Sequence, residues 1–257
     1  MPSAPSLATP ASHCPPHCND CRLRDATDAF RVLTPAQLAL VESLRLGSVT
    51  VAAGAQVIGE QAPNGKLFTL YAGWAFRYKS LPDGRRQILS FVLPGDLVGL
   101  QQEFGDTAAH GVEALTECTL CVFPGERLWD LFRSDPRLGY DVTWLAARAE
   151  GQVDDNLLTT GRRSAAERVA VLLVQLYRRL EHLGLAGADG SVPFPLNQQH
   201  MADALGLSLV HTNRTLRQLA RLGLQHIAQG RLQLPNPRAL ERAAEYFDLP
   251  PRRVPLL

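Results

Sequence analysis

The sequence predicts an α+β fold in which a β module, a long helix and an arginine-rich helical region follow one another along the chain. Three observations support this order. Short apolar stretches separated by glycine-bearing turns fill residues 49–124, a pattern typical of an antiparallel barrel or sandwich. A helical spacing of apolar residues takes over after Pro136, which indicates one long helix. From residue 161 onward the chain contains thirteen arginines and no lysine.

Length and composition limit the class of protein. A chain of 257 residues, of which 46% are hydrophobic, can form one large domain or two smaller ones. Residues 1–160 carry a net charge of −5 and residues 161–257 carry +6. An arginine-rich region fits a polyanionic partner, although an ordinary solvated surface can have the same composition.

The sequence gives no sign of a membrane or secreted protein. No apolar run approaches the roughly 20 residues of a membrane helix. The residues before Arg22 contain no lysine or arginine and no apolar core of a secretory signal. We therefore expect a cytoplasmic protein with no membrane partner.

The N-terminal region is expected to hold little regular structure. Residues 1–12 are rich in proline, serine and alanine. Together with the cysteine cluster that follows, they lead us to assign residues 1–27 to a disordered tail. Residues 33–49 are predicted to begin with a short amphipathic helix, because Thr34 can cap it and Pro35 suits its first position.

Residues 28–133 are predicted to form the β domain. The stretch LPDGRR at residues 81–86 is the clearest hairpin signal, because Pro-Asp-Gly supplies a fixed φ and a positive φ between two strands. An enzyme built on such a barrel would need clustered histidine and carboxylate ligands inside it. His110 is the only histidine between residues 49 and 124, so we predict no catalytic activity.

The long helix is assigned to residues 134–160, which begin at a Ser-Asp-Pro stop signal. Its apolar residues recur at steps of three and four and form one stripe: Leu138, Val142, Leu145, Ala149, Val153 and Leu157. A small barrel offers such a stripe few neighbours, so a second copy is the simplest partner and the helix is predicted to form a homodimer. The alternative is that the stripe packs against its own domain.

Residues 161–257 are predicted to form a winged helix-turn-helix domain. Within residues 196–224, Gly206 marks a turn between two helices and Ser208 can cap the second helix. In this motif the second helix enters the major groove of DNA. Residues 223–235 follow as a two-stranded wing with a Gln-Gly dipeptide at its tip.

The second helix should have a buried face and an exposed face. We expect Val210 or Leu209 to be buried together with Leu216 and Leu219. The opposite face should be available to a partner. On charge and position, that partner is double-stranded DNA.

Each exposed side chain of the second helix suits a particular contact. Arg214 can donate to guanine O6 and N7, and Asn213 can pair with adenine or with a phosphate. Arg217 and Arg221 are better placed for phosphates, which supply affinity rather than sequence reading. The hydroxyls of Ser208 and Thr212 can also donate to phosphates. The candidate DNA-binding residues are Ser208, Val210, His211, Thr212, Asn213, Arg214, Arg217 and Arg221.

These parts, in this order, resemble the Crp/Fnr superfamily of bacterial transcription regulators, in its Fnr/FixK-like branch. The resemblance rests on PGDLVGL (94–100), EALTECTLCVFP (113–124), AAERVAVLL (165–173) and LGLSLVHTNRTL (205–216). It implies a jelly-roll β-barrel similar to a cyclic-nucleotide-binding domain, then a dimerisation helix and a winged helix-turn-helix. It also implies a homodimeric regulator, such as an activator, that binds a palindromic promoter site and can contact RNA polymerase.

Two departures from the family pattern matter. Members that bind cyclic nucleotides hold the phosphate with a Gly-Glu segment followed by an Arg-Ser/Thr pair. The corresponding residues 98–115 contain no arginine, with Glu103 and Thr107 as the nearest candidates, so cAMP binding is not expected. The best-known members also carry a Glu-x-x-Ser/Gly-Arg pattern in the second helix. Here Val210 replaces the glutamate and Arg214 is kept, so Val210 can contact a thymine methyl group.

Five cysteines are candidates for a metal or redox site: Cys14, Cys18, Cys21, Cys118 and Cys121. A [4Fe–4S] cluster normally takes four thiolates. The resemblance implies three from the N-terminal segment and one from the barrel, and Cys18, Cys21 and Cys121 match three of these positions. The fourth, six residues after Cys21, is Thr27. Cys14, Cys118, His13 or His17 could substitute for it.

Other uses of the cysteines remain open. Zinc could bind Cys14, Cys18, Cys21 and a histidine, two thiols could form a switchable disulfide, or the sulfurs could have no sensing role. Cys118 and Cys121 lie on a strand-like run and should face opposite ways or straddle a bend. We predict a transcription regulator that responds to a redox or oxygen signal. The alternative is a cluster-free regulator of the same fold that is independent of any signal or responds to a small ligand.

Overall fold

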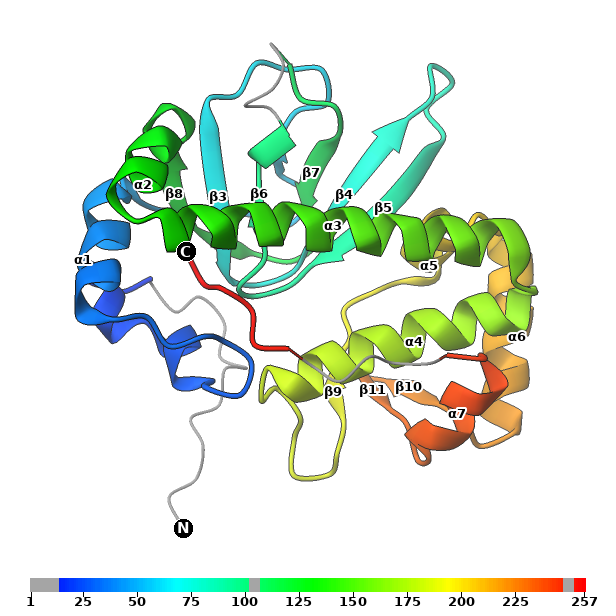
Figure 1. The fold of residues 1–257 in the computed structure, drawn as a ribbon. Coiled ribbons are helices and arrows are strands. Elements are labelled where there is room, and N and C mark those ends of the chain that lie inside the picture. The colour runs from blue at the N-terminus through cyan, green and yellow to red at the C-terminus, as the bar shows by residue number, and fades with distance from the viewer. Residues whose placement is uncertain (1–13, 102–106, 247–251) are drawn as a thin grey trace. The chain divides into compact units, whose positions relative to one another are not determined.

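The computed structural model describes residues 14–101, 107–246 and 252–257. These residues form two compact units (Figure 1). Residues 14–153 and 252–257 make up the barrel unit, and residues 154–246 make up the helical unit. Two residues of the sequence analysis, His13 and Glu103, lie outside the described residues.

The barrel unit is built on two four-stranded antiparallel sheets, as the spacing of turns predicts. One sheet has the order β1 (Gly47–Val51), β8 (Cys118–Pro124), β3 (Lys66–Ala72) and β6 (Leu97–Val98). The other has the order β2 (Gln56–Ile58), β7 (Gly111–Ala114), β4 (Ala75–Ser80) and β5 (Arg86–Val92). The predicted hairpin at residues 81–86 joins β4 to β5, with Gly84 at a φ of +85°.

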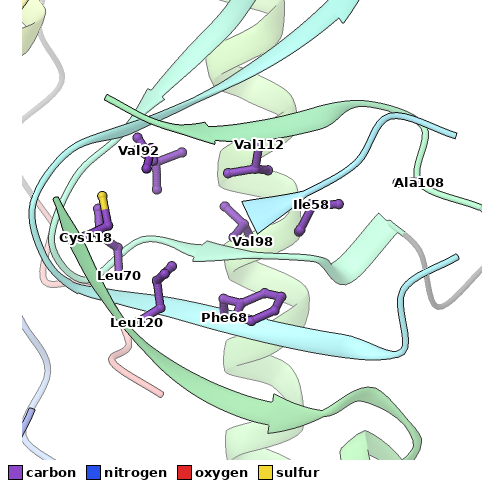
Figure 2. Close-up of a cluster of buried hydrophobic side chains, with 11 residues drawn as sticks. Ile58, Phe68, Leu70, Val92, Val98, Ala108, Val112, Cys118 and Leu120 are labelled. Carbon is purple, nitrogen blue, oxygen red and sulfur yellow. The ribbon is translucent and has the colours of Figure 1, made fainter. Parts of the chain in front are cut away.

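A core of apolar side chains fills the space between the two sheets (Figure 2). Phe68, Leu70 and Leu120 come from one sheet, and Val92 and Val112 from the other. Because side chains alternate along a strand, only every second residue can join this core. Residues on the outer face of β8 are therefore free to meet other parts of the chain.

Both ends of the chain contribute to the barrel unit. Short 3₁₀-helices at Cys18–Asp20 (η1) and Arg22–Asp25 (η2) bury Cys18 and Leu23. The prediction of a disordered tail is therefore wrong for residues 14–27, because their apolar side chains find a surface to cover. Helix α1 (Pro35–Leu44) begins as predicted, with Thr34 and Gln37 forming a capping box.

The last residues of the chain lie against this N-terminal segment. Val254 pairs with Phe30 in a parallel bridge, in which Arg31 N donates to Val254 O at 2.9 Å. Val254 N donates to Ala29 O at 2.8 Å. Leu256 is buried at 2% exposure. The hydrogen bonds and the buried leucine together hold residues 252–257 to the barrel unit.

Helix α3 (Pro136–Arg162) follows η4 (Gly125–Arg127) and α2 (Leu128–Ser134). The Asp135 carboxylate accepts from Arg137 N and Leu138 N at 2.9 and 3.1 Å, which fixes the predicted start of the helix. The helix is long enough to run through the boundary between the two units, which falls at Val153 and Asp154.

The first half of the apolar stripe of α3 packs against its own domain, which is the alternative to a dimer surface that the sequence left open. Leu138, Val142 and Leu145 are buried. The same face carries Asp141, which pairs with Arg31. It also carries Arg148, whose Nη1 lies 3.3 Å from Asp96 Oδ1. These contacts are all inside the barrel unit, so this half of the stripe packs against its own domain. Farther along, Leu157 is exposed.

The helical unit surrounds one buried helix. Helix α4 (Ala165–His182) begins at a capping box of Ser164 and Glu167 and buries most of its apolar side chains. It packs against α5 (Gln198–Leu205), α6 (Leu209–Arg221) and α7 (Pro237–Ala243). A small sheet completes the unit with strands in the order β10 (His226–Ala228), β11 (Arg231–Gln233) and β9 (Val192–Pro193). Within the described part of the chain, no helix is long and apolar enough to cross a membrane.

Candidate nucleic-acid interface and cysteine pocket

The turn between α5 and α6 has the geometry that the sequence predicts. Gly206 adopts a left-handed conformation with φ +62°, which a glycine accepts without steric cost. Leu207 N then donates to Ala202 O at 3.2 Å. Ser208 caps α6, since its hydroxyl accepts from His211 N at 3.2 Å. The two helices are therefore fixed in a helix-turn-helix arrangement.

The buried face of α6 differs from the predicted one. Thr212, Thr215, Leu216 and Leu219 are buried, whereas Val210 is 79% exposed and Leu209 is also exposed. A helix advances by about 100° per residue, so position 210 lies nearly opposite to positions 212, 216 and 219. The expectation that Val210 or Leu209 fills the core is wrong, because two threonines take that place.

Thr212 cannot contact DNA as expected. It is 0% exposed, and its hydroxyl donates to Ser208 O at 3.1 Å inside the helix. Asn213 is half-buried at the edge of the exposed face. The side chains that remain accessible from the predicted set are Ser208, Val210, His211, Arg214, Arg217 and Arg221.

Three arginines and one valine share the exposed face of α6. By the same 100° step, Val210, Arg214, Arg217 and Arg221 fall within about 60° of one another. Among the residues that the structure describes, none of these arginines pairs with a carboxylate. The face therefore presents positive charge to solvent, with an apolar side chain near the start of the helix.

The predicted wing is confirmed as a tight hairpin. Gln229 and Gly230 have φ values of +49° and +70°, which is the two-residue turn that suits the twist of a β-hairpin. Gln225 Nε2 donates to Leu216 O at 2.9 Å and ties the wing to α6. Arg231 does not reach outward, since its guanidinium donates to Ser191 Oγ and Ser191 O at 2.6 and 2.7 Å.

Four of the five cysteines line one pocket in the barrel unit. Cys14, Cys18 and Cys21 reach it from the N-terminal segment, and Cys121 from β8. The Cys14 and Cys121 sulfurs are 3.2 Å apart. The lining also includes Arg45, Tyr71, Phe123, Leu256 and Leu257. The contact could not be predicted from the sequence, because Cys14 and Cys121 are 107 positions apart.

Cys118 lies on the other face of β8. Figure 2 shows it in the core beside Leu70 and Leu120. Its thiol donates to Trp74 O at 3.0 Å, and burial raises its pKa to about 11. The expectation that the two cysteines of CTLC face opposite ways is confirmed, and Cys118 cannot join the other four sulfurs.

Arg45 organises the positive side of the pocket. Its guanidinium donates to Pro15 O at 2.9 Å and to Gly47 O at 3.2 Å, and lies 3.9 Å from Cys18 Sγ. A hydrogen bond from the Cys121 thiol lowers the pKa of Cys14 to about 7, and the charge of Arg45 adds to this effect against the opposing effect of burial. The same hydrogen bond, followed by burial, raises the pKa of Cys121.

Glu42 holds the cysteine segment from outside the pocket. Its carboxylate accepts from Cys18 N and from His17 Nδ1, both at 2.9 Å. The hydrogen bond to Glu42 raises the pKa of His17. His17 is exposed and does not line the pocket, so it is not placed to act as a fourth ligand.

The donor set does not fit a metal centre. Among the described residues, no three histidine, cysteine or acidic side chains converge at a spacing that could hold a metal ion. Two of the four sulfurs that would be needed are in direct contact with each other, and Thr27 occupies the position of the missing ligand. This arrangement suits neither a [4Fe–4S] cluster nor zinc, both of which need ligands spread around the metal.

A buried arginine in the β domain escaped the sequence analysis. Arg77 Nε donates to His110 Nε2 at 3.0 Å, and Nη2 donates to Gln101 Oε1 at 3.1 Å. Burial, and then the charge of Arg77, lowers the pKa of His110 to about 4. His110 is therefore a neutral acceptor. An arginine between the aromatic residues Phe76 and Tyr78 of β4 was the only available signal.

Comparisons with known proteins agree with both units. Residues 48–135 match the model of the cyclic nucleotide-binding domain, and residues 167–243 match that of the Crp-like helix-turn-helix domain. Over 227 residues the chain is 34% identical to the nitrogen fixation regulation protein FixK of Bradyrhizobium diazoefficiens, covering 88% of this chain and 93% of that protein. The chain belongs to the Crp/Fnr family of transcription regulators.

Other relatives place this Crp/Fnr protein in the FixK-like branch. It is 29% identical to the transcriptional activator protein FnrL of Cereibacter sphaeroides, over 80% of this chain and 83% of that one. The structure of FixK2 from Bradyrhizobium japonicum superposes with a TM-score of 0.69 at 28% identity, over 76% of this chain and 95% of that one. This Crp/Fnr protein is thus a DNA-binding transcription regulator and not an enzyme.

Proposed function

We propose that the chain acts as a homodimer that binds a palindromic promoter site through α6 and responds to a redox or oxygen signal at the cysteine pocket. The observation that carries the DNA-binding part is the exposed arginine face of α6, which has no carboxylate partner among the described residues. Such a regulator acts in the cytoplasm, where it meets double-stranded DNA and can contact RNA polymerase.

The position of each exposed side chain on α6 determines which part of the DNA it contacts. Arg214 lies in the middle of the face, so it reads guanine, and Val210 precedes it by one turn, so it contacts a thymine methyl group. Arg217 and Arg221 lie farther along the helix and bind phosphates. Ser208 and His211 flank the start of the helix and contact the backbone.

The dimer seam lies on the face of α3 that the barrel unit leaves uncovered. Exposed or half-buried residues recur there at alternating steps of four and three: Tyr140, Trp144, Ala147, Gly151, Asp154 and Leu158. That spacing is the heptad pattern of paired helices. Ala147 and Gly151 allow the two backbones to approach closely, and a two-fold axis would bring the partner's copy of the same helix into register.

The pocket cysteines act as thiols rather than as cluster ligands in this proposal. Two observations support this role. Cys14 and Cys121 are in direct contact, and no three histidine, cysteine or acidic side chains among the described residues are arranged to hold a metal ion. The second candidate is a regulator of the same type that is independent of any signal. Cyclic nucleotide is not proposed as the ligand, because residues 98–115 lack an arginine for its phosphate.

Selection from a randomised duplex pool tests the DNA-binding part. The expected result is a pair of inverted half-sites. Arg214→Ala should weaken binding to the selected site by about 1–3 kcal/mol and relax the base preference at one position of each half-site. Arg217→Ala should weaken all sequences alike and reduce the salt dependence of binding by about one phosphate contact.

Arg238, exposed on α7, supplies the matched control. Arg238→Ala removes the same charge from the same unit and should leave the base preference unchanged. If Arg214→Ala and Arg238→Ala have the same effect, α6 does not read the bases and the assignment is wrong.

A further inference from the structure

We infer that Cys14 and Cys121 form a redox-active thiol pair, which a hydroperoxide oxidises to a disulfide between the N-terminal segment and strand β8. The inference rests on the proposed redox function and supplies its chemistry. It assigns a covalent modification site to two named residues.

The Cys14 and Cys121 sulfurs are close enough for a disulfide to form. The two sulfurs are 3.2 Å apart, and each belongs to a residue with 9% exposure. A disulfide needs a separation of about 2.05 Å, so only a small rotation of the side chains is required. Cys14 belongs to the N-terminal segment, before the first 3₁₀-helix, and Cys121 to a paired strand. The N-terminal partner can therefore adjust.

The fold favours this pair over the other pairs of cysteines. Cys118 is on the inner face of β8 and is hydrogen-bonded to Trp74 O, so β8 itself separates it from Cys14. Cys18 is held by Glu42 through its backbone N–H, and its sulfur lies near Arg45 rather than another sulfur. Cys14–Cys121 is the one sulfur–sulfur contact found among the described residues.

The surroundings favour a small oxidant. Leu256, Leu257, Tyr71 and Phe123 line the pocket together with the cysteines, so a bulky reagent would have to displace the end of the chain. Arg45 supplies the positive charge near Cys14. A cation beside a thiol favours the thiolate, which is the nucleophile in thiol oxidation.

The chemistry balances in two steps. The Cys14 thiolate attacks the outer oxygen of a hydroperoxide, which breaks the O–O bond and, after one proton is taken up, gives Cys14 sulfenic acid and an alcohol or water. The Cys121 sulfur then attacks the sulfenic sulfur. The S–S bond forms, the S–O bond breaks, and water leaves with the Cys121 proton. Two thiols and one hydroperoxide thus give one disulfide, one alcohol or water, and one further water.

The bond would change the barrel unit in a defined way. It would fasten the N-terminal segment, and with it the paired residues 29–31 and 254, to the outer face of β8. A cross-link between residues far apart in sequence reduces the freedom of the unfolded chain. Oxidised protein should therefore unfold at a higher temperature than reduced protein.

The test uses full-length protein purified with a thiol reductant under nitrogen, in which iron and acid-labile sulfide are measured before oxidation. Hydrogen peroxide is then added, remaining thiols are alkylated, and the intact mass and the linked peptides are determined. We expect neither iron nor sulfide, a mass that corresponds to three alkylated cysteines and one disulfide instead of five alkylated cysteines, and a peptide that joins Cys14 to Cys121. Cys14→Ser and Cys121→Ser should lose this product, whereas Cys18→Ser and Cys118→Ser should keep it.

DNA affinity is measured on the same samples, so that failure of the disulfide inference can be told apart from failure of the DNA-binding proposal. Three results would overturn the inference and leave the DNA-binding proposal standing, provided that the reduced protein binds DNA. They are the absence of a Cys14–Cys121 bond, a disulfide to Cys18 or Cys21 in its place, and a content of about four irons per chain. A Cys14–Cys121 bond in protein that binds DNA equally well in both states supports the inference and removes the redox response from the proposed function. A several-fold change in affinity that is lost in Cys121→Ser supports both.

Discussion

At the scale of single residues, two arginines of the barrel unit, the buried Arg77 and the half-buried Arg31, show how this chain places charge beside apolar side chains. Arg77 is satisfied by the neutral side chains His110 and Gln101, whereas Arg31 pairs with the buried Asp141. A buried guanidinium without acceptors would cost several kcal/mol. His110 is useful to Arg77 only as long as its ring carries no proton on Nε2.

The lowered pKa of His110 makes the stability of the barrel unit sensitive to acid. Its folded pKa of about 4 lies below the usual 6.5, under the influence of burial, Arg77 and Lys79. The unfolded chain therefore binds more protons between pH 4 and 6.5, so the free energy of unfolding falls as the pH drops through that range. His110→Gln should remove up to about 3 kcal/mol of this pH dependence.

Urea unfolding at pH 5 and pH 7.5, followed by tryptophan fluorescence, measures the effect. Trp74, Trp129 and Trp144 all lie in the barrel unit, so the signal reports on that unit. His226→Gln changes an exposed histidine of the helical unit and serves as the control. An unchanged difference between the two pH values in His110→Gln would contradict the assignment.

At the scale of elements, the proposed partner-binding faces of α3 and α6 are both faces that a simple apolar pattern would not select. The apolar stripe of α3 is used by its own unit at Leu138, Val142 and Leu145, which leaves a face of small and mixed residues. On α6 the core is reached by Thr212 and Thr215, while Val210 is exposed. In each case the proposed face is the one that the fold leaves uncovered.

Gly151→Arg tests the proposed seam without endangering the fold. A side chain added at Gly151 meets no atom within 4 Å, and replacing glycine by arginine inside a helix should stabilise the helix by about 0.5–1 kcal/mol. We expect the variant to be folded but monomeric by sedimentation equilibrium. Ala146→Arg, about 140° around the same helix, should remain a dimer. A dimeric Gly151→Arg protein would place the seam elsewhere.

At the scale of the whole molecule, described residues from opposite ends of the sequence share one site. Cys14 and Leu257, the first and the last described residues, line the same pocket. Residues 252–257 belong to the barrel unit although the residues before them belong to the helical unit. The helical unit is therefore connected to the barrel unit by the chain at both of its ends.

Leu256→Ala should loosen this return of the chain. Removing a fully buried leucine side chain costs about 3 kcal/mol, and Leu256 is 2% exposed. We expect faster alkylation of Cys121 by iodoacetamide in the reduced protein, since a wall of its pocket is lost. Leu222→Ala, an exposed leucine of the helical unit, should change neither the unfolding free energy nor the alkylation rate. Equal alkylation of wild type and Leu256→Ala would show that the terminal residues do not cover the pocket.

Local signals in the sequence predicted local structure well. Thr34 and Ser208 cap the helices they were expected to cap, and Gln229-Gly230 forms the tip of the wing. In each case the chemistry that ends or turns the chain lies within a few residues, so it can be read without the fold. The fold class and the family followed from the order of such elements.

Contacts between distant parts of the chain could not be predicted in this way. The pairing of Cys14 with Cys121, the return of Leu256 and Leu257, and the burial of Arg77 depend on which strands are neighbours. Periodicity identifies the faces of a helix but does not say which neighbour covers them, which is why Thr212 was assigned to DNA and Val142 to a second copy.

The position of the carboxyl terminus has a practical consequence. Leu257 lines the cysteine pocket, so an affinity tag fused behind it would push a polar extension into the wall of that pocket. Material prepared in this way should show altered thiol reactivity even with an unaltered sequence. A tag inserted in the β4–β5 turn, where Asp83 and Gly84 are exposed and Gly84 has open space around it, would leave the contacts of residues 252–257 with the pocket unchanged.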